Sequence, residues 1–329
     1  MPVIKKCSYT PPFWLPGGHA QTIGPRFFCR SPRCVYRREY LELDDGDFFS
    51  VDWLLAHKEG NRLAGRLAIL SHGLEGDSRS LYVKTLAKTL LAAGWDVAAR
   101  NFRSCGEMNR LPRIYHSGET DDLHAVVRHV MERGYRHIAL AGFSMGGNQV
   151  LMYLGRDRER VPAEVKAAAV VSVPCDLPSS SRALARPENR VYMEYFMRTL
   201  RKKMRAKHRE FPELFDVAGL DAMKTFKEFD DRFTAPIHGF KDAEDYWVKA
   251  SSKPYLGDIA MPTLLVNAKN DPFLEPECFP EEEAEANPFF HLMTPEDGGH
   301  VGFPGSSATP DWLNTTLLDF LSLGATGNA

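Results

Sequence analysis

A serine lies in a glycine-rich turn between a predicted strand and a predicted helix, where its hydroxyl could act as a nucleophile. Residues 142–146 read Gly-Phe-Ser-Met-Gly, which fits the G-x-S-x-G pattern. The apolar run 137–141 before the turn predicts a buried strand, and residues 148–154 after it predict a helix. The two glycines keep Cβ atoms out of a sharp turn, and free N–H groups at a helix start can stabilise negative charge. Ser144 is therefore the candidate nucleophile, and a solvated serine in a glycine-rich turn is the alternative.

A serine hydroxyl is a poor nucleophile at neutral pH unless a base takes its proton and an acid orients that base. His300 is the candidate base, because the glycines around it let its loop direct the imidazole toward Ser144. Asp271 is the candidate acid, since it follows the apolar run 263–266, and open α/β sheets place their sites at the carboxyl ends of strands. A turn aspartate before proline is the alternative for Asp271, and Asp176 is the second candidate acid.

A second glycine-containing loop could supply the hydrogen-bond donors that such chemistry needs. Residues 72–76 read His-Gly-Leu-Glu-Gly and directly follow the predicted strand 67–70. Two backbone N–H groups should stabilise the oxyanion that forms when a hydroxyl attacks a carbonyl. We expect these donors to be the N–H groups of Leu74 and Met145. His72 precedes the serine in the chain, so we expect it to brace this loop rather than to act as the base.

Apolar and amphipathic runs alternate along much of the chain, which predicts a mostly parallel sheet with helices on both faces. After a proline-rich entry at residues 11–16, the first predicted element is a hairpin over residues 35–55 that turns at 44–47. One helix carries an apolar stripe from Leu123 to Met131 and follows Thr120, which is placed to cap it. The remaining strands are expected at 67–70, 95–99, 137–141, 167–173, 263–266 and 289–293, and helices at 81–93, 148–154 and 311–323, with an acidic helix before the last strand.

The alternation stops between residues 178 and 255, a charged and aromatic stretch of mostly helical pattern. An insertion between two core strands is typical of a lid, so we expect 178–255 to be a helical cap on a core of residues 1–177 and 256–329. Residues 198–209 hold seven lysines and arginines, which could bind an anionic substrate or a membrane surface, or form a solvated helix face. Four aromatic residues could line an acyl pocket or form ordinary cap core: Tyr192, Phe196, Phe226 and Trp247.

The composition disfavours several classes of protein and site. Lysine and arginine number 41 against 43 acidic residues among 329, so no global positive charge favours nucleic acid. No apolar run approaches the roughly 18 residues of a membrane span, and the first residues lack the apolar core of a signal peptide, so we expect a cytoplasmic protein. The six cysteines are scattered without a CxxC pair or a histidine cluster, which favours free thiols and no metal site.

Five segments carry a family resemblance: GHAQT at 18–22, HGLEG at 72–76, NFRSCG at 101–106, GFSMGGN at 142–148 and FDDRFT at 229–234. With them the chain resembles the α/β-hydrolase superfamily over almost its whole length. More narrowly it resembles the YheT-like branch, bacterial esterases related to eukaryotic α/β-hydrolase-domain lipases. One departure is Ser104, where we expect glycine in a tight turn. The resemblance implies an α/β-hydrolase fold, with the cap inserted before the acid-bearing strand, and ester hydrolysis without a cofactor.

These observations favour a serine carboxylesterase that acts through an acyl-enzyme on an ester of short or medium acyl chain. Ser144, Asp271 and His300 would form its triad. A thioesterase, a lipase or phospholipase, an amidase or an acyltransferase would share the first half-reaction. An alternative of another class is a ligand-binding protein that keeps the fold without turnover. The expected partner is a small-molecule or lipid acyl ester, with peripheral membrane contact left open and no nucleic acid, metal or transmembrane segment.

Overall fold

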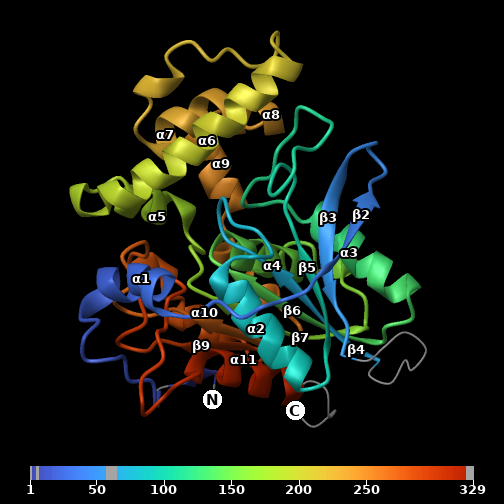
Figure 1. The fold of residues 1–329 in the computed structure, drawn as a ribbon, viewed down its shortest axis with the longest axis vertical. Helices are drawn as coiled ribbons and strands as arrows, with labels where there is room; N and C mark the ends of the chain where they lie inside the picture. The colour runs from blue at the N-terminus through green and yellow to red at the C-terminus, as the bar shows by residue number, and fades with distance from the viewer. Residues whose placement is uncertain (1, 5–6, 57–64, 324–329) are drawn as a thin grey trace.

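A sheet of nine strands runs through the centre of the part of the chain that the computed structural model describes, residues 2–4, 7–56 and 65–323 (Figure 1). The strand order is β1-β9-β8-β7-β6-β4-β5-β3-β2. The strands are β1 (Val3–Ile4), β2 (Arg37–Glu42), β3 (Phe48–Leu54), β4 (Arg66–Ser71), β5 (Asp96–Arg100), β6 (His137–Phe143), β7 (Val165–Val171), β8 (Thr263–Val266) and β9 (Phe290–Met293).

Most neighbouring strands of this sheet are parallel, as the alternating pattern predicts. The exceptions are the β2–β3 hairpin and its junction with β5, where the strands pair in antiparallel register. The hairpin turns at residues 43–47, as its turn residues indicate. Parallel pairing sets the carboxyl ends of β4, β6, β7, β8 and β9 along one edge, and the loops after these strands hold the candidate residues.

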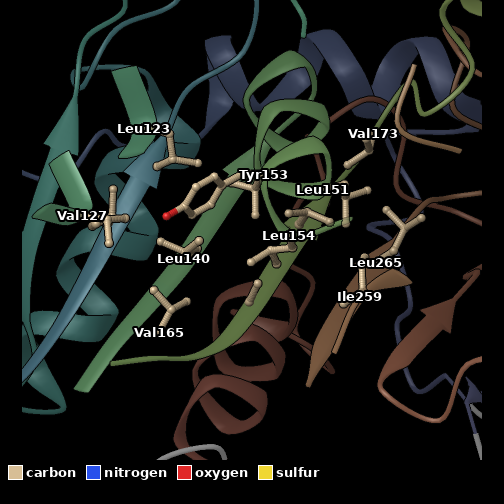
Figure 2. Packing of buried hydrophobic residues seen from close by; sticks show 14 of the residues in the cluster. Leu123, Val127, Leu140, Leu151, Tyr153, Leu154, Val165, Val173, Ile259 and Leu265 are labelled. Atoms are coloured by element: carbon tan, nitrogen blue, oxygen red, sulfur yellow. The ribbon is translucent and has the colours of Figure 1, made fainter. Parts of the chain in front are cut away.

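Helices cover both faces of the sheet. Successive residues of a strand point to opposite faces, so the apolar strands present side chains on both sides for helices to bury. On β4, Leu67 and Ile69 belong to one buried cluster, while Ala68 and Leu70 belong to the other. The first cluster includes residues of α3 (Asp121–Glu132), α4 (Met145–Gly155) and α10 (Glu281–Ala286), and Figure 2 shows part of it. The second includes residues of α2 (Leu81–Ala92) and α11 (Trp312–Leu323). The predicted doubly covered, mostly parallel sheet is confirmed.

One predicted detail of α3 is wrong. Thr120 is the residue before the helix, but its side chain makes no capping hydrogen bond. Its hydroxyl instead donates to the carboxylate of Asp157, which also accepts from Arg156. The carboxylate of Glu119 takes over the capping role by accepting the N–H of Asp121. The carboxylate of Asp157, which is distant in the sequence, thus takes the Thr120 hydroxyl that would otherwise cap the helix.

The first forty residues contain a helix that the sequence analysis does not predict. The helix α1 (Gly17–Phe28) has Pro25 within it, no acidic residue in its first turn and no side-chain cap. These features weaken the usual signals of a helix. The short strand β1 is also unpredicted, and it adds to the sheet beside β9.

The chain between β7 and β8 forms a helical layer that lies above the sheet in Figure 1. It contains α5 (Leu177–Leu184), α6 (Arg190–Glu210), α7 (Phe226–Phe229), α8 (Ala235–His238) and α9 (Ala243–Ala250). These helices bury a cluster of their own, with Met197, Met204 and Phe229 among its members. The predicted helical pattern is therefore present, and the division at 178 and 255 stays a prediction.

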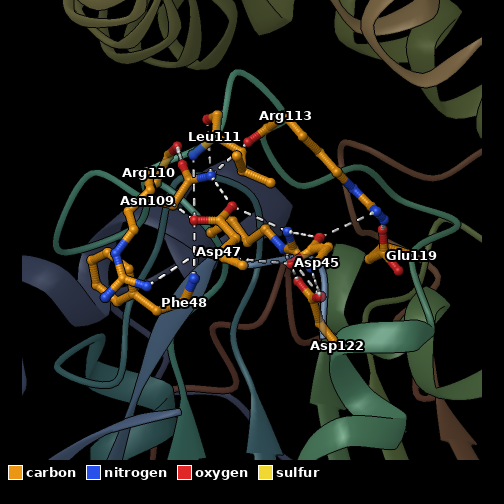
Figure 3. A network of polar contacts seen from close by, with 12 residues as sticks. Asp45, Asp47, Phe48, Asn109, Arg110, Leu111, Arg113, Glu119 and Asp122 are labelled. Atoms are coloured by element: carbon orange, nitrogen blue, oxygen red, sulfur yellow. Dashed lines mark hydrogen bonds and ion pairs between the residues drawn. The ribbon is translucent and has the colours of Figure 1, made fainter. Parts of the chain in front are cut away.

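A buried polar network holds the loop after β5 against the hairpin (Figure 3). The Arg103 guanidinium donates to the carboxylates of Asp45, Asp47 and Asp122. Burial opposes ionisation of Asp47, but hydrogen bonds from Asn109 and two backbone N–H groups keep its pKa below the usual value. Because each buried charge has partners of opposite charge or hydrogen-bond donors, this loop is tied firmly to the sheet.

Ser104 occupies the left-handed position for which we expect glycine. Its φ angle is 62°, a conformation that side chains other than glycine rarely adopt. The hydroxyl of Ser104 donates to the Asn109 side chain, inside the same polar network. This hydrogen bond offsets part of the backbone strain, so the turn forms with serine in place of glycine.

Candidate active site

Ser144 lies at the sharp turn between β6 and α4. Its backbone has φ 54° and ψ −122°, which is a strained conformation for a residue with a side chain. The glycines on either side are needed for space. A Cβ on Gly142 would lie 2.6 Å from the carbonyl oxygen of Gly146, and one on Gly146 would lie 2.3 Å from the carbonyl oxygen of His72. The turn therefore has the crowding that the glycine pattern predicts.

The structure brings Ser144, His300 and Asp271 into one hydrogen-bonded chain. The Ser144 Oγ lies 2.9 Å from His300 Nε2. On the other side of the ring, His300 Nδ1 lies 2.9 Å and 3.1 Å from the two carboxylate oxygens of Asp271. A carboxylate accepts, so Nδ1 carries the proton, and Nε2 is free to accept from the serine hydroxyl. The imidazole is thus oriented as a base toward Ser144.

Asp176, the second candidate acid, has a different task. Its carboxylate accepts the N–H of Ser179 and so caps α5. The Asp271 side chain is completely buried, and its Oδ1 also accepts the N–H of Phe273. The carboxylate that orients His300 is that of Asp271.

The helix α1 braces the loop that carries His300, a role that the sequence analysis missed. The backbone N–H of His300 donates to Thr22 Oγ1 over 2.8 Å, and that of Gly298 donates to Gln21 Oε1 over 2.7 Å. The Gln21 amide in turn donates to the carboxylate of Asp297. The only signal for this role in the sequence is the GHAQT segment at 18–22, which is one of the five segments of the family resemblance.

Replacing Thr22 with valine should lower kcat about tenfold with little change in KM, because the His300 loop loses an acceptor that holds its backbone. Thr22→Ser keeps the hydroxyl and should restore the rate. Thr89→Val, whose hydroxyl donates to the Thr85 carbonyl within α2, is the matched control. Steady-state kinetics on a soluble ester would decide, and an unchanged kcat in Thr22→Val would exclude this positioning role.

The two expected oxyanion donors lie beside the serine. Leu74 and Met145 line the same cavity as Ser144 and His300. Met145 is the first residue of α4, so its N–H has no acceptor within the helix. The loop that holds Leu74 turns tightly, with a hydrogen bond from Gly76 N–H to the Gly73 carbonyl. The arrangement can offer N–H donors to a negative oxygen, and their assignment stays a prediction.

His72 braces this loop, as expected from its place in the chain. Its Nε2 accepts the backbone N–H of Phe102, so the proton lies on Nδ1, which donates to the Gly73 carbonyl over 2.7 Å. The residue is 1% exposed, and burial lowers its pKa to about 3. The imidazole is therefore neutral throughout the physiological range and unable to take up a proton there.

The neutral His72 predicts a loss of stability in acid. Between pH 6.5 and about 3 the unfolded chain binds a proton at this residue and the folded chain does not, so the unfolding free energy decreases as the pH falls. The loss at pH 5 should be about 2 kcal/mol. In urea unfolding from pH 5 to 7.5, His72→Asn should show a flatter dependence on pH than the parent. Identical slopes would contradict the assignment. Other buried histidines contribute equally to both proteins.

A cavity of about 100 Å³ opens onto Ser144 and His300, and its wall is mostly apolar. The cap supplies much of that wall, including Phe196, Phe226 and Trp247. Three of the four aromatic residues left open by the sequence thus line the cavity. Tyr192 lies behind it, in edge contact with Phe273.

The cavity wall also contains an acidic residue that the sequence did not indicate there, Asp230. Its carboxylate accepts from the Trp247 indole over 2.8 Å and from the Thr234 hydroxyl over 2.6 Å. Burial raises the pKa of this carboxyl to about 6. Asp230 opens a π-helical turn, Asp230–Thr234, a backbone form that is often found at functional sites.

The basic segment 198–209 is more than a solvated face, because some of its cations are buried. Three of its seven cations point into the protein, and two of these dock the cap on the core. Lys203 donates to Glu75 of the loop 72–76, and Lys207 donates to the carbonyls of Asn109 and Leu111. Arg201 donates to a carbonyl within the cap.

Other site classes have little support among the described residues. No group of three or more histidine, cysteine or acidic side chains in residues 2–4, 7–56 and 65–323 is arranged to hold a metal ion. Each of the six cysteines is a free thiol. Among the same residues, no helix has the length and apolar character to span a bilayer.

Comparison with known proteins gives concordant similarities. Residues 69–305 match the family model described as alpha/beta hydrolase fold. The chain is 37% identical over 313 residues to YheT of Escherichia coli (strain K12), with 91% of each chain covered. It is 33% identical over 309 residues to phospholipase ABHD3 of Mus musculus, covering 92% of this chain and 74% of that protein. It is 28% identical over 268 residues to the monoacylglycerol lipase of Saccharomyces cerevisiae, covering 78% and 59%.

A solved structure resembles the fold over nearly the same range. The Pyrococcus furiosus esterase Pf2001 aligns with a TM-score of 0.61 at 18% identity, covering 89% of this chain and 96% of that one. At this identity the likeness extends to the fold alone.

Proposed function

Because this chain belongs to the α/β-hydrolase family and to its YheT-like branch, we propose that it is a serine carboxylic ester hydrolase with Ser144 as nucleophile. An esterase or lipase type of hydrolase is the activity that its relatives share. The single observation that supports this serine most strongly is the hydrogen-bonded chain from Ser144 Oγ through His300 to the Asp271 carboxylate.

The reaction starts with the attack of Ser144 Oγ on the acyl carbon of the ester. His300 Nε2 takes the hydroxyl proton, and Asp271 stabilises the imidazolium that forms. The N–H groups of Leu74 and Met145 donate to the oxyanion of the tetrahedral intermediate. As the intermediate collapses, His300 gives its proton to the leaving alkoxide, and an acyl-serine remains. Water deprotonated by His300 then attacks the acyl carbon and releases the acid.

The cap of residues 178–255 supplies the acyl pocket in this proposal. Its aromatic and aliphatic side chains form an apolar wall around a cavity of about 100 Å³, which suits an acyl chain of short or medium length. A lipase or phospholipase is the second candidate, because two of the relatives carry those names. A thioesterase or acyltransferase would use the same acyl-enzyme. A cytoplasmic location stays a prediction from the sequence.

Labelling with a fluorophosphonate probe tests the nucleophile. The probe should modify the folded protein at one serine, and mass spectrometry of the digest should locate the adduct on Ser144. Absence of labelling would favour the non-catalytic, ligand-binding alternative.

A series of p-nitrophenyl esters with two to sixteen acyl carbons tests the substrate class. Turnover should be greatest for short or medium chains and should decline for chains longer than the cavity. A maximum at the longest chains would favour the lipase alternative. Labelling without turnover of any ester would favour a thioester or amide substrate.

A further inference from the structure

Four large aromatic side chains are exposed together at the two ends of α1. Phe13 is 95% exposed, Trp14 50%, Phe27 72% and Phe28 66%. The rings of Trp14 and Phe28 touch edge to face, with centroids 5.2 Å apart, so the two pairs form one surface. We call these four residues the α1 aromatic patch. Exposed aromatic clusters of this kind mark interaction sites more often than isolated exposed side chains do.

The chain around this patch is basic. Residues 1–38 contain seven lysines and arginines and no acidic residue, although the whole protein has a net charge of −2. Arg26, Arg30 and Arg33 are exposed and flank Phe27 and Phe28 in the chain. Among the described residues, no carboxylate forms an ion pair with these three arginines. Aromatic rings beside unneutralised arginines complement a surface that is negatively charged at its edge and apolar beneath it.

The helix α1, which carries the patch at its ends, lies near the candidate active site. His19 of α1 stacks on Tyr192, the ring of Tyr192 meets that of Phe273, and Phe273 lies 4.1 Å from the His300 ring. Arg26 lies over the ring of Tyr195 on the same cap helix. In Figure 1, α1 accordingly lies beneath the first cap helices.

We propose that the α1 aromatic patch docks the protein on an anionic lipid bilayer. The four rings would enter the interface between headgroups and acyl chains, and the three arginines would bind lipid phosphates. A second copy of this chain fits less well, because a symmetric contact would bring two basic surfaces together. The inference goes beyond the proposed function, since vesicle binding does not need the Ser144 hydroxyl.

Vesicle binding of the full-length protein tests the proposal. The protein should sediment with vesicles of phosphatidylcholine and phosphatidylglycerol, much less with phosphatidylcholine alone, and less at high salt. Trp14 provides a second readout, because Trp53, Trp95 and Trp247 are buried and Trp312 is half-buried against Tyr9 and Phe303. Its emission should shift to the blue and be quenched by brominated lipids. No sedimentation of the parent protein with the anionic vesicles would overturn the proposal.

Two variants separate the apolar and the charged contributions. Phe27→Ser/Phe28→Ser should abolish quenching by brominated lipids, and Arg26→Gln/Arg30→Gln/Arg33→Gln should weaken binding to anionic vesicles about 100-fold. The matched controls are Leu214→Ser/Val248→Ser, at residues 62% and 61% exposed, and Arg128→Gln/Arg136→Gln/Arg158→Gln, whose side chains are also exposed. Equal vesicle binding by the patch variants and the control variants would overturn the proposal. It would also be overturned if the parent protein self-associated and only the patch variants lost this self-association.

Hydrolysis of dissolved p-nitrophenyl acetate distinguishes the two proposals. The patch variants should hydrolyse it at the parent rate, which also shows that they fold. If the parent hydrolyses the soluble ester and ignores vesicles, docking is wrong and the esterase stands. If it binds vesicles but neither hydrolyses esters nor reacts with the fluorophosphonate, docking stands and the esterase is wrong.

Discussion

Ser144→Ala should lower kcat on p-nitrophenyl esters by about 10⁴-fold or more, because no acyl-enzyme can form without the hydroxyl. KM should change little, since the apolar wall of the cavity stays intact. The free energy of unfolding should also change little. Alanine bears the same strained backbone as serine at φ 54°, and only one hydrogen bond of the side chain, that to His300, is lost.

Steady-state kinetics with the soluble ester series measures this effect. Ser181→Ala is a suitable control, because Ser181 lines the same cavity without contacting His300 among the described hydrogen bonds. Its kcat should equal that of the parent. If Ser144→Ala retained the parent rate and still reacted with a fluorophosphonate, the nucleophile would have to be another side chain, and the proposed mechanism would be wrong.

The second large effect is expected at the junction of cap and core, where Lys203→Met leaves a buried carboxylate without its cation. Lys203 and Glu75 have side chains only 6% exposed, and Tyr115 donates to the same Glu75 oxygen. Removing one partner of such a pair typically costs about 3 to 5 kcal/mol. Glu75 directly follows Leu74 and has φ 55°, so we also expect kcat to fall, up to about 100-fold, as the oxyanion donor moves.

A double variant separates the lost charge from the lost packing. In Lys203→Met/Glu75→Gln neither position carries a charge, so this pair leaves no unpaired charge buried. The glutamine oxygen can still accept from Tyr115. Most of the stability and part of the rate should therefore return. Lys202→Met, at the exposed neighbour on α6, should match the parent in both. Urea unfolding and kinetics on a soluble ester measure the two effects, and a double variant no better than Lys203→Met would show that charge is not the cause.

Local sequence patterns predicted the sheet and the turn at Ser144 because both depend on neighbouring residues. A buried parallel strand is an apolar run, and a strained turn needs glycine where a Cβ would collide. Asp271 and His300 could be identified as candidates because each follows a strand that ends at the same edge. The helix α1 could not be predicted in this way, because Pro25 and the missing cap weaken its local signal. Its bracing role depends on contacts with residues far along the chain, such as Asp297.

The amino-acid sequence alone specified every strand except β1, the order of these strands along the chain and the candidate Ser144, Asp271 and His300. Only the folded chain determined which cations of α6 face inward and that Asp230 enters the cavity wall. Lys202 and Lys203 are identical in type and adjacent in sequence, so no local pattern separates their roles. Their roles differ because Lys203 faces the buried carboxylate of Glu75, whereas Lys202 is exposed to solvent. Such long-range contacts arise from packing between distant segments, which local sequence patterns do not encode.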